Sequence, residues 1–168
     1  MHFRTISTSV AFIAFCLSSA ADPAVKIINF SANWCPLCRV LDPRLADAAD
    51  RFKDRGVTLV EVDMTGLTRS DDNAQKALIA QLQALTEAHD TAYLWDWYGG
   101  HAGIAVIIAA DNGEPLSCIT TALSTSQIED RLQESLILAT KVKPGHRRPT
   151  GTDCPPPMPN RIVAQPIP

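Results

Sequence analysis

The order of apolar and polar positions along the chain predicts two strands early in the chain and a hairpin late in it. Residues 25–30 are largely apolar and end in a polar turn, and residues 57–62 form a second such run. Both runs are typical of strands buried in a sheet. Two further runs, at about 104–109 and 115–120, flank an Asp-Asn-Gly turn, which is a hairpin signal.

Three stretches have apolar residues at the spacing of an α-helix, at about 36–54, 72–89 and 125–140. Asp71 or Asp72 is placed to cap the second helix, and Ser124 or Thr125 to cap the third. The resulting order is strand, helix, strand, helix, hairpin, helix. It predicts an α/β fold with a mixed central sheet and helices on both faces.

An aromatic stretch, residues 92–101, separates the second helix from the hairpin. One interpretation makes Trp95, Trp97 and Tyr98 a peptide-binding wall, with His101 as a proton donor or metal ligand. For the aromatics we favour a hydrophobic extension that caps the domain, because most large apolar side chains are buried.

The two ends of the chain differ in composition from the part between them. Residues 1–21 carry His2 and Arg4, then an apolar stretch, then small residues, which is the pattern of a cleaved signal peptide. Eight of the last 25 residues are proline, so residues 141–168 are predicted to be an extended, disordered tail. Residues 22–140 are then the folded domain.

Composition and charge narrow the class of function. The chain has 15 Lys and Arg against 18 Asp and Glu, a formal net charge of −3, and 46% hydrophobic residues. The predicted domain has no basic stripe with interleaved aromatics, which argues against nucleic acid binding. The apolar N-terminal stretch is too short to span a bilayer. We therefore expect an exported globular protein, periplasmic if the host is Gram-negative.

Two cysteines two residues apart, Cys35 and Cys38, follow the first strand and open the first predicted helix. Unpaired backbone N–H groups and the helix dipole favour a thiolate at such a place, and the thiolate is the reactive form. Cys35 is therefore placed as the nucleophile, and Cys38 as the thiol that resolves a mixed disulfide. Pro36 suits the first helical position.

Two other interpretations of this pair remain open. A Cys-x-x-Cys pair is half of many zinc sites, but Cys118 and Cys154 stand alone and supply no second pair. The pair could also be an inert structural disulfide, although so short a loop gains little stability. Redox chemistry is the favoured interpretation.

The chain resembles the thioredoxin-like family. Trp34 precedes the cysteine motif as in that family, and Pro43 stands at the family's offset after Cys38. Residues 57–63 resemble the following strand, and residues 103–114 resemble the late strand with its turn. The resemblance covers about residues 25–139.

This resemblance implies the minimal version of the thioredoxin-like fold and thiol–disulfide oxidoreductase activity at Cys35 and Cys38. Trp34 and Pro36 would shape the motif. No metal and no organic cofactor is implied. The expected partners are protein thiols or disulfides and a redox partner, for which a membrane-embedded protein is one option. A monomer is expected, and the direction of electron flow is left open.

The sequence departs from the family at two places near the motif. The family has a buried aspartate in the first strand, where this chain has Asn29, and an amide cannot act as a base. Glu61 is a candidate replacement, although a solvent-facing strand residue is the slightly favoured interpretation. The family's cis-proline aligns with Ala105, so that peptide is expected to be trans.

These departures keep a second hypothesis open. A non-catalytic binding module, such as a metal carrier using Cys35, Cys38 and His101, or an assembly factor, fits the same motif. Cys118 and Cys154 are free to form a further disulfide.

Overall fold

The computed structural model describes residues 23–68 and 71–158. Within them, a four-stranded mixed sheet consists of β1 (Val25–Ser31), β2 (Val57–Asp63), β3 (Ile104–Ala109) and β4 (Pro115–Thr120), in the spatial order β2-β1-β3-β4. β1 runs parallel to β2 and antiparallel to β3, and β3 and β4 form the predicted hairpin. The mixed α/β sheet is confirmed. The expected signal peptide, residues 1–21, lies outside the described residues.

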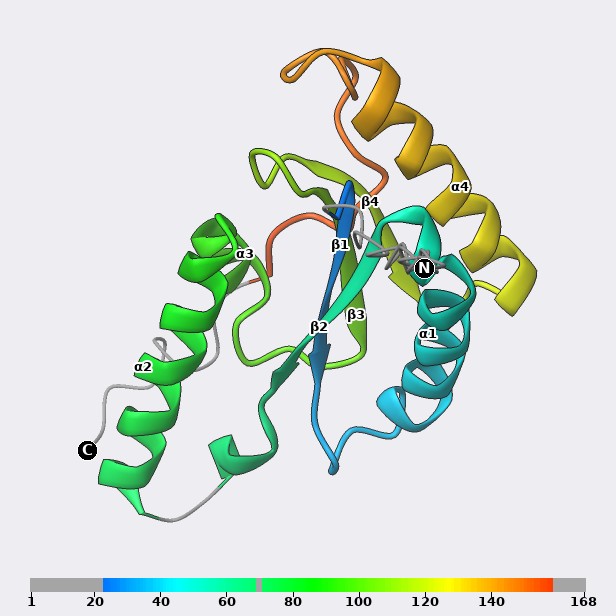
Figure 1. The fold of residues 1–168 in the computed structure, drawn as a ribbon. Coiled ribbons are helices and arrows are strands. Elements are labelled where there is room, and N and C mark those ends of the chain that lie inside the picture. Colours follow the sequence, from blue (N-terminus) through cyan, green and yellow to red (C-terminus); the bar gives the residue numbers. More distant parts are fainter. Residues whose placement is uncertain (1–22, 69–70, 159–168) are drawn as a thin grey trace, which may run out of the picture.

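The helices of the described chain are α1 (Cys38–Phe52), α2 (Asp72–Ala88), α3 (Ala92–Tyr98) and α4 (Thr125–Lys141), with 3₁₀ turns at Lys53–Arg55 and Thr65–Thr68. α1 and α4 pack on one face of the sheet, and α2 and α3 lie on the other (Figure 1). Asp71 caps α2 by accepting from two backbone N–H groups, and Ser124 forms a capping box with Gln127 at the start of α4.

The alternation of β3 explains how one strand serves both faces. Ala105, Ile107 and Ala109 belong to the core beneath α1 and α4. The side chains between them, Ile104, Val106 and Ile108, belong to the core on the α2 and α3 side. Since side chains alternate along a strand, a fully apolar strand has to be covered on both faces.

The aromatic stretch forms a short helix, α3, which was not predicted. Trp95 and Tyr98 are buried there, and Tyr98 packs edge-on against Phe30 of β1. For Trp95 and Tyr98 the interpretation of a hydrophobic extension that caps the domain is confirmed, because both are buried, whereas Trp97 is only partly buried. This helix has only seven residues, and its apolar side chains do not lie on one side of it. The spacing of apolar residues therefore did not predict the helix.

The tail differs from its prediction. Residues 141–158 lie against the domain, tied by a Cys118–Cys154 disulfide and by a hydrogen bond of 2.9 Å from Met158 N–H to the carbonyl of Trp97. Arg148 Nε donates to the carbonyl of Leu116 at 2.8 Å. The prediction of a disordered tail is therefore wrong for residues 141–158. This segment buries little apolar surface, but the disulfide and hydrogen bonds to the domain hold it in place.

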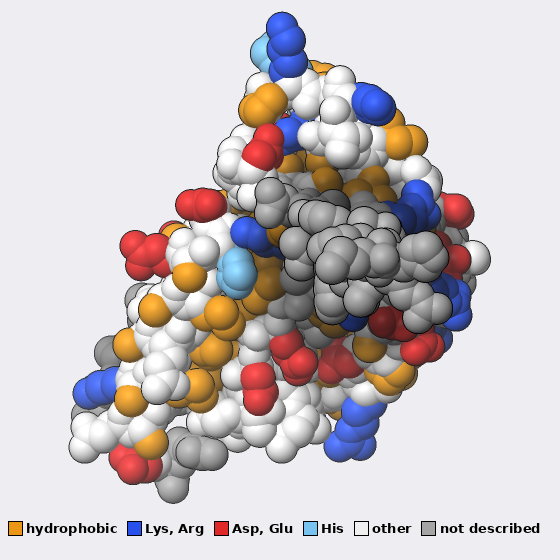
Figure 2. Space-filling view, in the orientation of Figure 1, with side chains coloured by type: hydrophobic (Ala, Val, Ile, Leu, Met, Phe, Trp, Pro, Cys, Tyr) orange, Lys and Arg blue, Asp and Glu red, His pale blue; other side chains and the backbone are white. Residues whose placement is uncertain are grey.

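The surface is mixed in character. Figure 2 shows Lys and Arg interspersed with Asp and Glu on the face viewed, and hydrophobic side chains along α2 and α3. In the ranges that the structure describes, every helix is too short or too polar to cross a bilayer.

Candidate active site

The loop between β1 and α1 brings two cysteines to the N-terminal end of a helix. β1 ends at Ser31, and Cys35 N–H then donates to the carbonyl of Ala32 at 3.1 Å, which closes a turn. Cys35 and Cys38 form a disulfide with their Cα atoms 5.3 Å apart. The loop thus presents the pair at the end of a central strand.

The helix terminus acts on Cys35 through one backbone group. Cys38 N–H donates to Cys35 Sγ at 3.1 Å. When the disulfide is reduced, an N–H group and the positive end of the helix dipole favour a negatively charged sulfur at this position. The geometry therefore supplies the electrostatic stabilisation that the sequence predicts for the Cys35 thiolate.

The position of Pro36 corrects one prediction. Pro36 was expected at the first helical position, but α1 begins at Cys38 with Leu37 as its N-cap (φ −68°, ψ −36°). The amides of Val40 and Leu41 both bond to the carbonyl of Leu37, so that carbonyl is the first one used by the helix. Pro36 lies exposed in the turn before it.

A groove borders Cys35, and we call it the apolar groove. It is lined by Trp34 to Leu37, by residues 100–104, by Thr120 and Thr121, and by Pro155 and Met158 of the tail. Trp34 and Leu37, 39% and 52% exposed, are among its lining residues. Cys35 itself is 3% exposed, and this groove offers a partner a way to approach its sulfur.

A second hollow borders Cys38, and we call it the acidic hollow. Its polar lining comes from Ser31, Asn33, Arg39, Asp42, Glu61, Asp63 and Thr65. Cys38 is 1% exposed. The two cysteines of one disulfide therefore face different chemistry: Cys35 lines an apolar groove, and Cys38 lines a hollow with three carboxylates.

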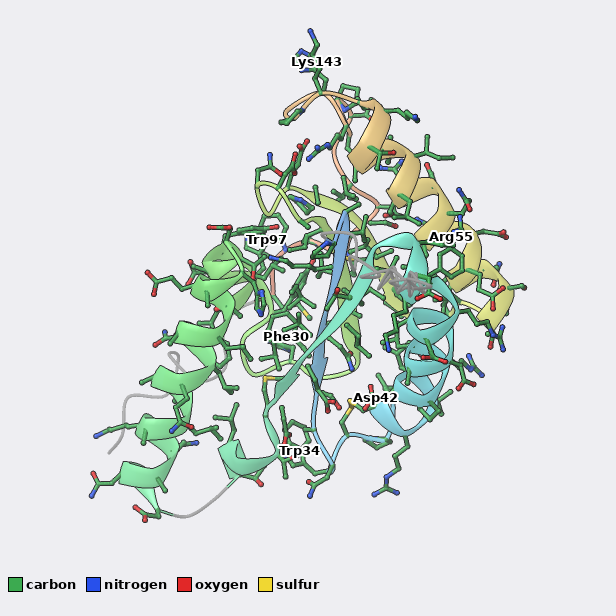
Figure 3. All side chains as sticks on the ribbon, viewed as in Figure 1. Phe30, Trp34, Asp42, Arg55, Trp97 and Lys143 are labelled. Carbon is green, nitrogen blue, oxygen red and sulfur yellow. A yellow bond between two sulfur atoms is a disulfide. The ribbon has the colours of Figure 1, made fainter. Side chains whose placement is uncertain are left out.

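Asp42 is held in this hollow by two residues of β1. Asn29 Nδ2 donates to Asp42 Oδ1 at 3.0 Å, and Ser31 Oγ donates to Asp42 Oδ2 at 2.6 Å. Asp42 stands in the second turn of α1, next to the end of β1 (Figure 3). Both oxygens of the carboxylate have a donor, which fixes its orientation.

Glu61 shares the acidic hollow from β2, where it pairs in register with Asn29. Its side chain is exposed, in agreement with the favoured interpretation of a solvent-facing strand residue. Partial burial raises the pKa of Glu61 above its usual range, and the nearby carboxylates Asp42 and Asp63 raise it further. The hollow therefore concentrates negative charge around Cys38.

A family model described as Thioredoxin matches residues 13–89. This part of the chain is thioredoxin-like. Two curated proteins are similar over short segments. The Thiol:disulfide interchange protein DsbE homolog of Paracoccus denitrificans is 39% identical over 46 residues, 27% of this chain and 26% of that protein. A Schizosaccharomyces pombe protein named as a protein disulfide-isomerase is 44% identical over 41 residues, 24% of this chain and 8% of that protein.

The matched segments thus span about a quarter of one curated relative and less than a tenth of the other. Among solved structures, this thioredoxin-like chain is similar to a thiol:disulfide interchange protein of Chlorobium tepidum, with 22% identity, a TM-score of 0.43, and coverage of 67% of this chain and 79% of that one. A secreted disulfide oxidoreductase of Mycobacterium tuberculosis has 19% identity, a TM-score of 0.40, and coverage of 67% and 82%.

At Asn29, the first departure from the thioredoxin-like pattern, the structure places a carboxylate from another element. Asn29, where the family has an aspartate, is 2% exposed and donates its amide to Asp42. A carboxylate is therefore still present beside the pair, but it comes from α1 instead of β1. Asp42 was missed in the sequence, although its position four residues after Cys38 on a helix was a signal that could have found it.

The second departure concerns the residue beside the cysteines. The described residues contain no cis peptide, so the peptide before Ala105 is trans, as expected. Ala105 is buried in the core under α1 and α4, whereas Cys35 and Cys38 belong to the other core. The residue that approaches the pair is Gly103: a Cβ built there would lie 3.5 Å from Cys35 Sγ.

The structure also places the remaining candidates of this thioredoxin-like chain. His101 lines the apolar groove with Cys35. Within residues 23–68 and 71–158, no three His, Cys, Asp or Glu residues are grouped so as to hold a metal ion. Cys118 and Cys154 form the further disulfide that the sequence allowed.

Proposed function

We propose that this chain is an exported thiol–disulfide oxidoreductase that exchanges the Cys35–Cys38 disulfide with protein thiols or disulfides. The observation that carries the proposal is the asymmetry of the pair. Cys35 lines the apolar groove and accepts a hydrogen bond from the Cys38 amide, while Cys38 lies behind it on α1. One sulfur can meet a partner, and the other is placed to release it.

The exchange needs no cofactor, only the two cysteines, the sulfurs of the partner and an acceptor for the proton of Cys38. The Cys35 thiolate attacks one sulfur of a partner disulfide, the partner's S–S bond breaks, and its other sulfur leaves as a thiolate. Cys38 then attacks Cys35 Sγ, which forms the Cys35–Cys38 disulfide and releases the second partner sulfur. The partner gains two electrons and the cysteine pair loses them; the same steps in reverse oxidise a partner dithiol.

Export is supported by two separate features. Residues 1–21 have the composition of a signal peptide. The Cys118–Cys154 disulfide joins the tail to β4, and such structural disulfides persist in oxidising compartments. A redox partner in or outside the membrane would then supply or accept electrons.

The reduction potential of the Cys35–Cys38 pair tests the proposal. The protein is equilibrated in graded glutathione buffers, alkylated, digested and weighed, so that each cysteine pair is followed separately. A potential near about −270 mV means that the protein reduces partners, and one near about −120 mV means that it oxidises them. A pair that never equilibrates would overturn the proposal.

A trapping experiment separates exchange from the alternative of a binding module. Cys38→Ala is expected to accumulate a mixed disulfide between Cys35 and a cysteine-containing peptide, because the resolving thiol is missing. Cys35→Ala is the matched control and should trap nothing. Stoichiometric metal on the wild-type protein that is lost in Cys35→Ala, with no mixed disulfide in either variant, would favour the metal carrier.

A further inference from the structure

The resolving step requires Cys38 to lose a proton in a place where water barely reaches it. Cys38 is 1% exposed, and a neutral thiol is a poor nucleophile. A thiol that is shielded from water ionises reluctantly unless a base takes its proton or a positive charge stabilises the thiolate. The acidic hollow is the polar space that Cys38 lines, so its groups decide where the proton goes.

Four charged residues face this hollow. Arg39 and Asp42 come from α1, and Glu61 and Asp63 come from β2. β1 contributes Asn29 and Ser31 behind the carboxylate of Asp42, and both donate to it. With three carboxylates and one guanidinium, the hollow is better suited to accept a proton than to stabilise a thiolate by charge alone.

Asp42 is the best placed of these carboxylates. It follows Cys38 by four residues on α1, so both side chains project from the same face of the helix, one turn apart. Its two hydrogen bonds to β1 hold it in one orientation. No hydrogen bond to the Glu61 carboxylate is present among the described residues, and that side chain is exposed on the strand.

We propose that Asp42 is the proton acceptor for Cys38 in the resolving step, and that Asn29 and Ser31 are positioning residues that hold its carboxylate. This inference rests on the proposed exchange function. The Cys38 S–H bond breaks and the proton passes to a carboxylate oxygen of Asp42, directly or through one water in the polar hollow. Cys38 Sγ bonds to Cys35 Sγ, and the partner sulfur leaves with the electron pair of the broken bond.

The role of Asn29 follows from its geometry. The amide Nδ2 donates to Asp42 and holds its carboxylate in place, while Asn29 Oδ1 is buried without a partner in the described structure. A carboxylate at position 29 would instead face Asp42 at hydrogen-bonding distance and repel it. Asn29 on β1 therefore supplies the hydrogen-bond donor that the Asp42 carboxylate on α1 accepts.

Two-phase kinetics with 5,5′-dithiobis(2-nitrobenzoate) isolate the resolving step. The protein is first reduced to two free thiols, and alkylation with mass analysis verifies that the Cys118–Cys154 disulfide is intact. Attack by Cys35 releases one coloured thiolate, and attack by Cys38 on the resulting mixed disulfide releases the second. The first phase is an internal reference for folding and access.

Asp42→Asn is expected to slow the second phase about a hundredfold near pH 6.5, the lower end of the usual effect of a general base. The deficit should shrink as the pH rises toward about 9, because solvent then ionises the Cys38 thiol without help. The first phase should change by less than about twofold. Asp42→Glu, which keeps a carboxylate, should recover part of the rate at low pH.

Asp47→Asn removes the same charge from an exposed position of α1 and is the matched control. It should leave both phases unchanged. Equal second-phase rates in wild type and Asp42→Asn across the pH range would overturn the inference, as would a larger loss in Glu61→Gln. A wild-type protein that shows no second phase would instead overturn the proposed exchange function.

Discussion

Arg147 of the tail forms a bidentate interaction with Asp111 of the hairpin turn through both terminal nitrogens of its guanidinium group. Nη1 donates to Oδ1 at 2.8 Å, and Nη2 donates to Oδ2 at 2.7 Å. The Arg147 side chain is 2% exposed, and its remaining hydrogen bonds go to the side chains of Asn112 and Glu114 and to the carbonyls of Ala139 and Val142. A buried charge that has these partners fixes the path of the tail over β3, β4 and α4.

Arg147→Ala is expected to lower the free energy of unfolding by about 2 kcal/mol. Removing one partner of a buried ion pair usually costs more, but Asp111 is 51% exposed and regains water. Chemical denaturation measures the change. Lys143→Ala removes an exposed cation from the same segment and should change stability by less than about 0.5 kcal/mol. Equal effects of the two substitutions would contradict this account.

The same ion pair predicts how stability depends on pH. The hydrogen bond from Arg147 holds the pKa of Asp111 below its ordinary value of 3.8. A lowered pKa in the folded state contributes stability that is present above that ordinary value and is lost as the pH falls through the folded value. Unfolding curves from about pH 7 to 2.5 should therefore show wild type and Arg147→Ala converging in acid. A gap that stays constant would mean that the Asp111 carboxylate contributes nothing.

The second disulfide should carry much of the tail's contribution to stability. Cys118 and Cys154 are separated by 36 residues, and a loop of that size corresponds to about 3–4 kcal/mol in the chain-entropy account. Cys118→Ala with Cys154→Ala is expected to lose about this amount in a urea titration, and protease should cut the tail more readily. The matched control, Cys35→Ala with Cys38→Ala, opens a separation of only three residues and should lose less.

Gly103 is expected to tolerate no side chain because of its place beside the motif. Its φ is +91°, and an added Cβ would lie 2.9 Å from Leu37 Cβ and 3.5 Å from Cys35 Sγ. Gly145 has a similar φ of +79° with nothing within 4 Å of its added Cβ, so Gly145→Ala measures the backbone cost alone, about 1–2 kcal/mol. Gly103→Ala should exceed that by about 1–3 kcal/mol and slow attack by Cys35. Equal losses at the two positions would contradict the close contact.

Most of the fold could be read from the chain because its strongest signals are local. The predicted strand at 104–109 agrees with β3, and the capped stretch at 72–89 agrees with α2 to within one residue. Both have long apolar runs or stripes bounded by turn and cap residues, so burial and local preference agree. The cysteine pair was equally easy to predict, since only two residues separate Cys35 in the turn from Cys38 at the start of α1.

The residues that the sequence left out depend on contacts between distant segments. Asp42 gains its place from Asn29 on another element, and Arg147 gains its place from Asp111, 36 residues earlier. Proline content predicted a tail without a core, which is a statement about average burial. The Cys118–Cys154 disulfide and the buried guanidinium of Arg147 nevertheless hold the tail against the domain. Amino-acid composition does not reveal such individual contacts.

Part of the lining of the apolar groove comes from the C-terminal tail, which belongs neither to the sheet nor to its helices. Pro155 and Met158 form part of its lining, and Cys154 anchors them next to β4, well over a hundred residues after the motif that holds the nucleophile. Substitutions or length changes beyond residue 154 would therefore reshape what surrounds the Cys35 sulfur while the reacting loop stays intact. The reactive cysteines and part of the lining of the apolar groove come from separate segments of the chain. Each segment can therefore change in evolution without the other.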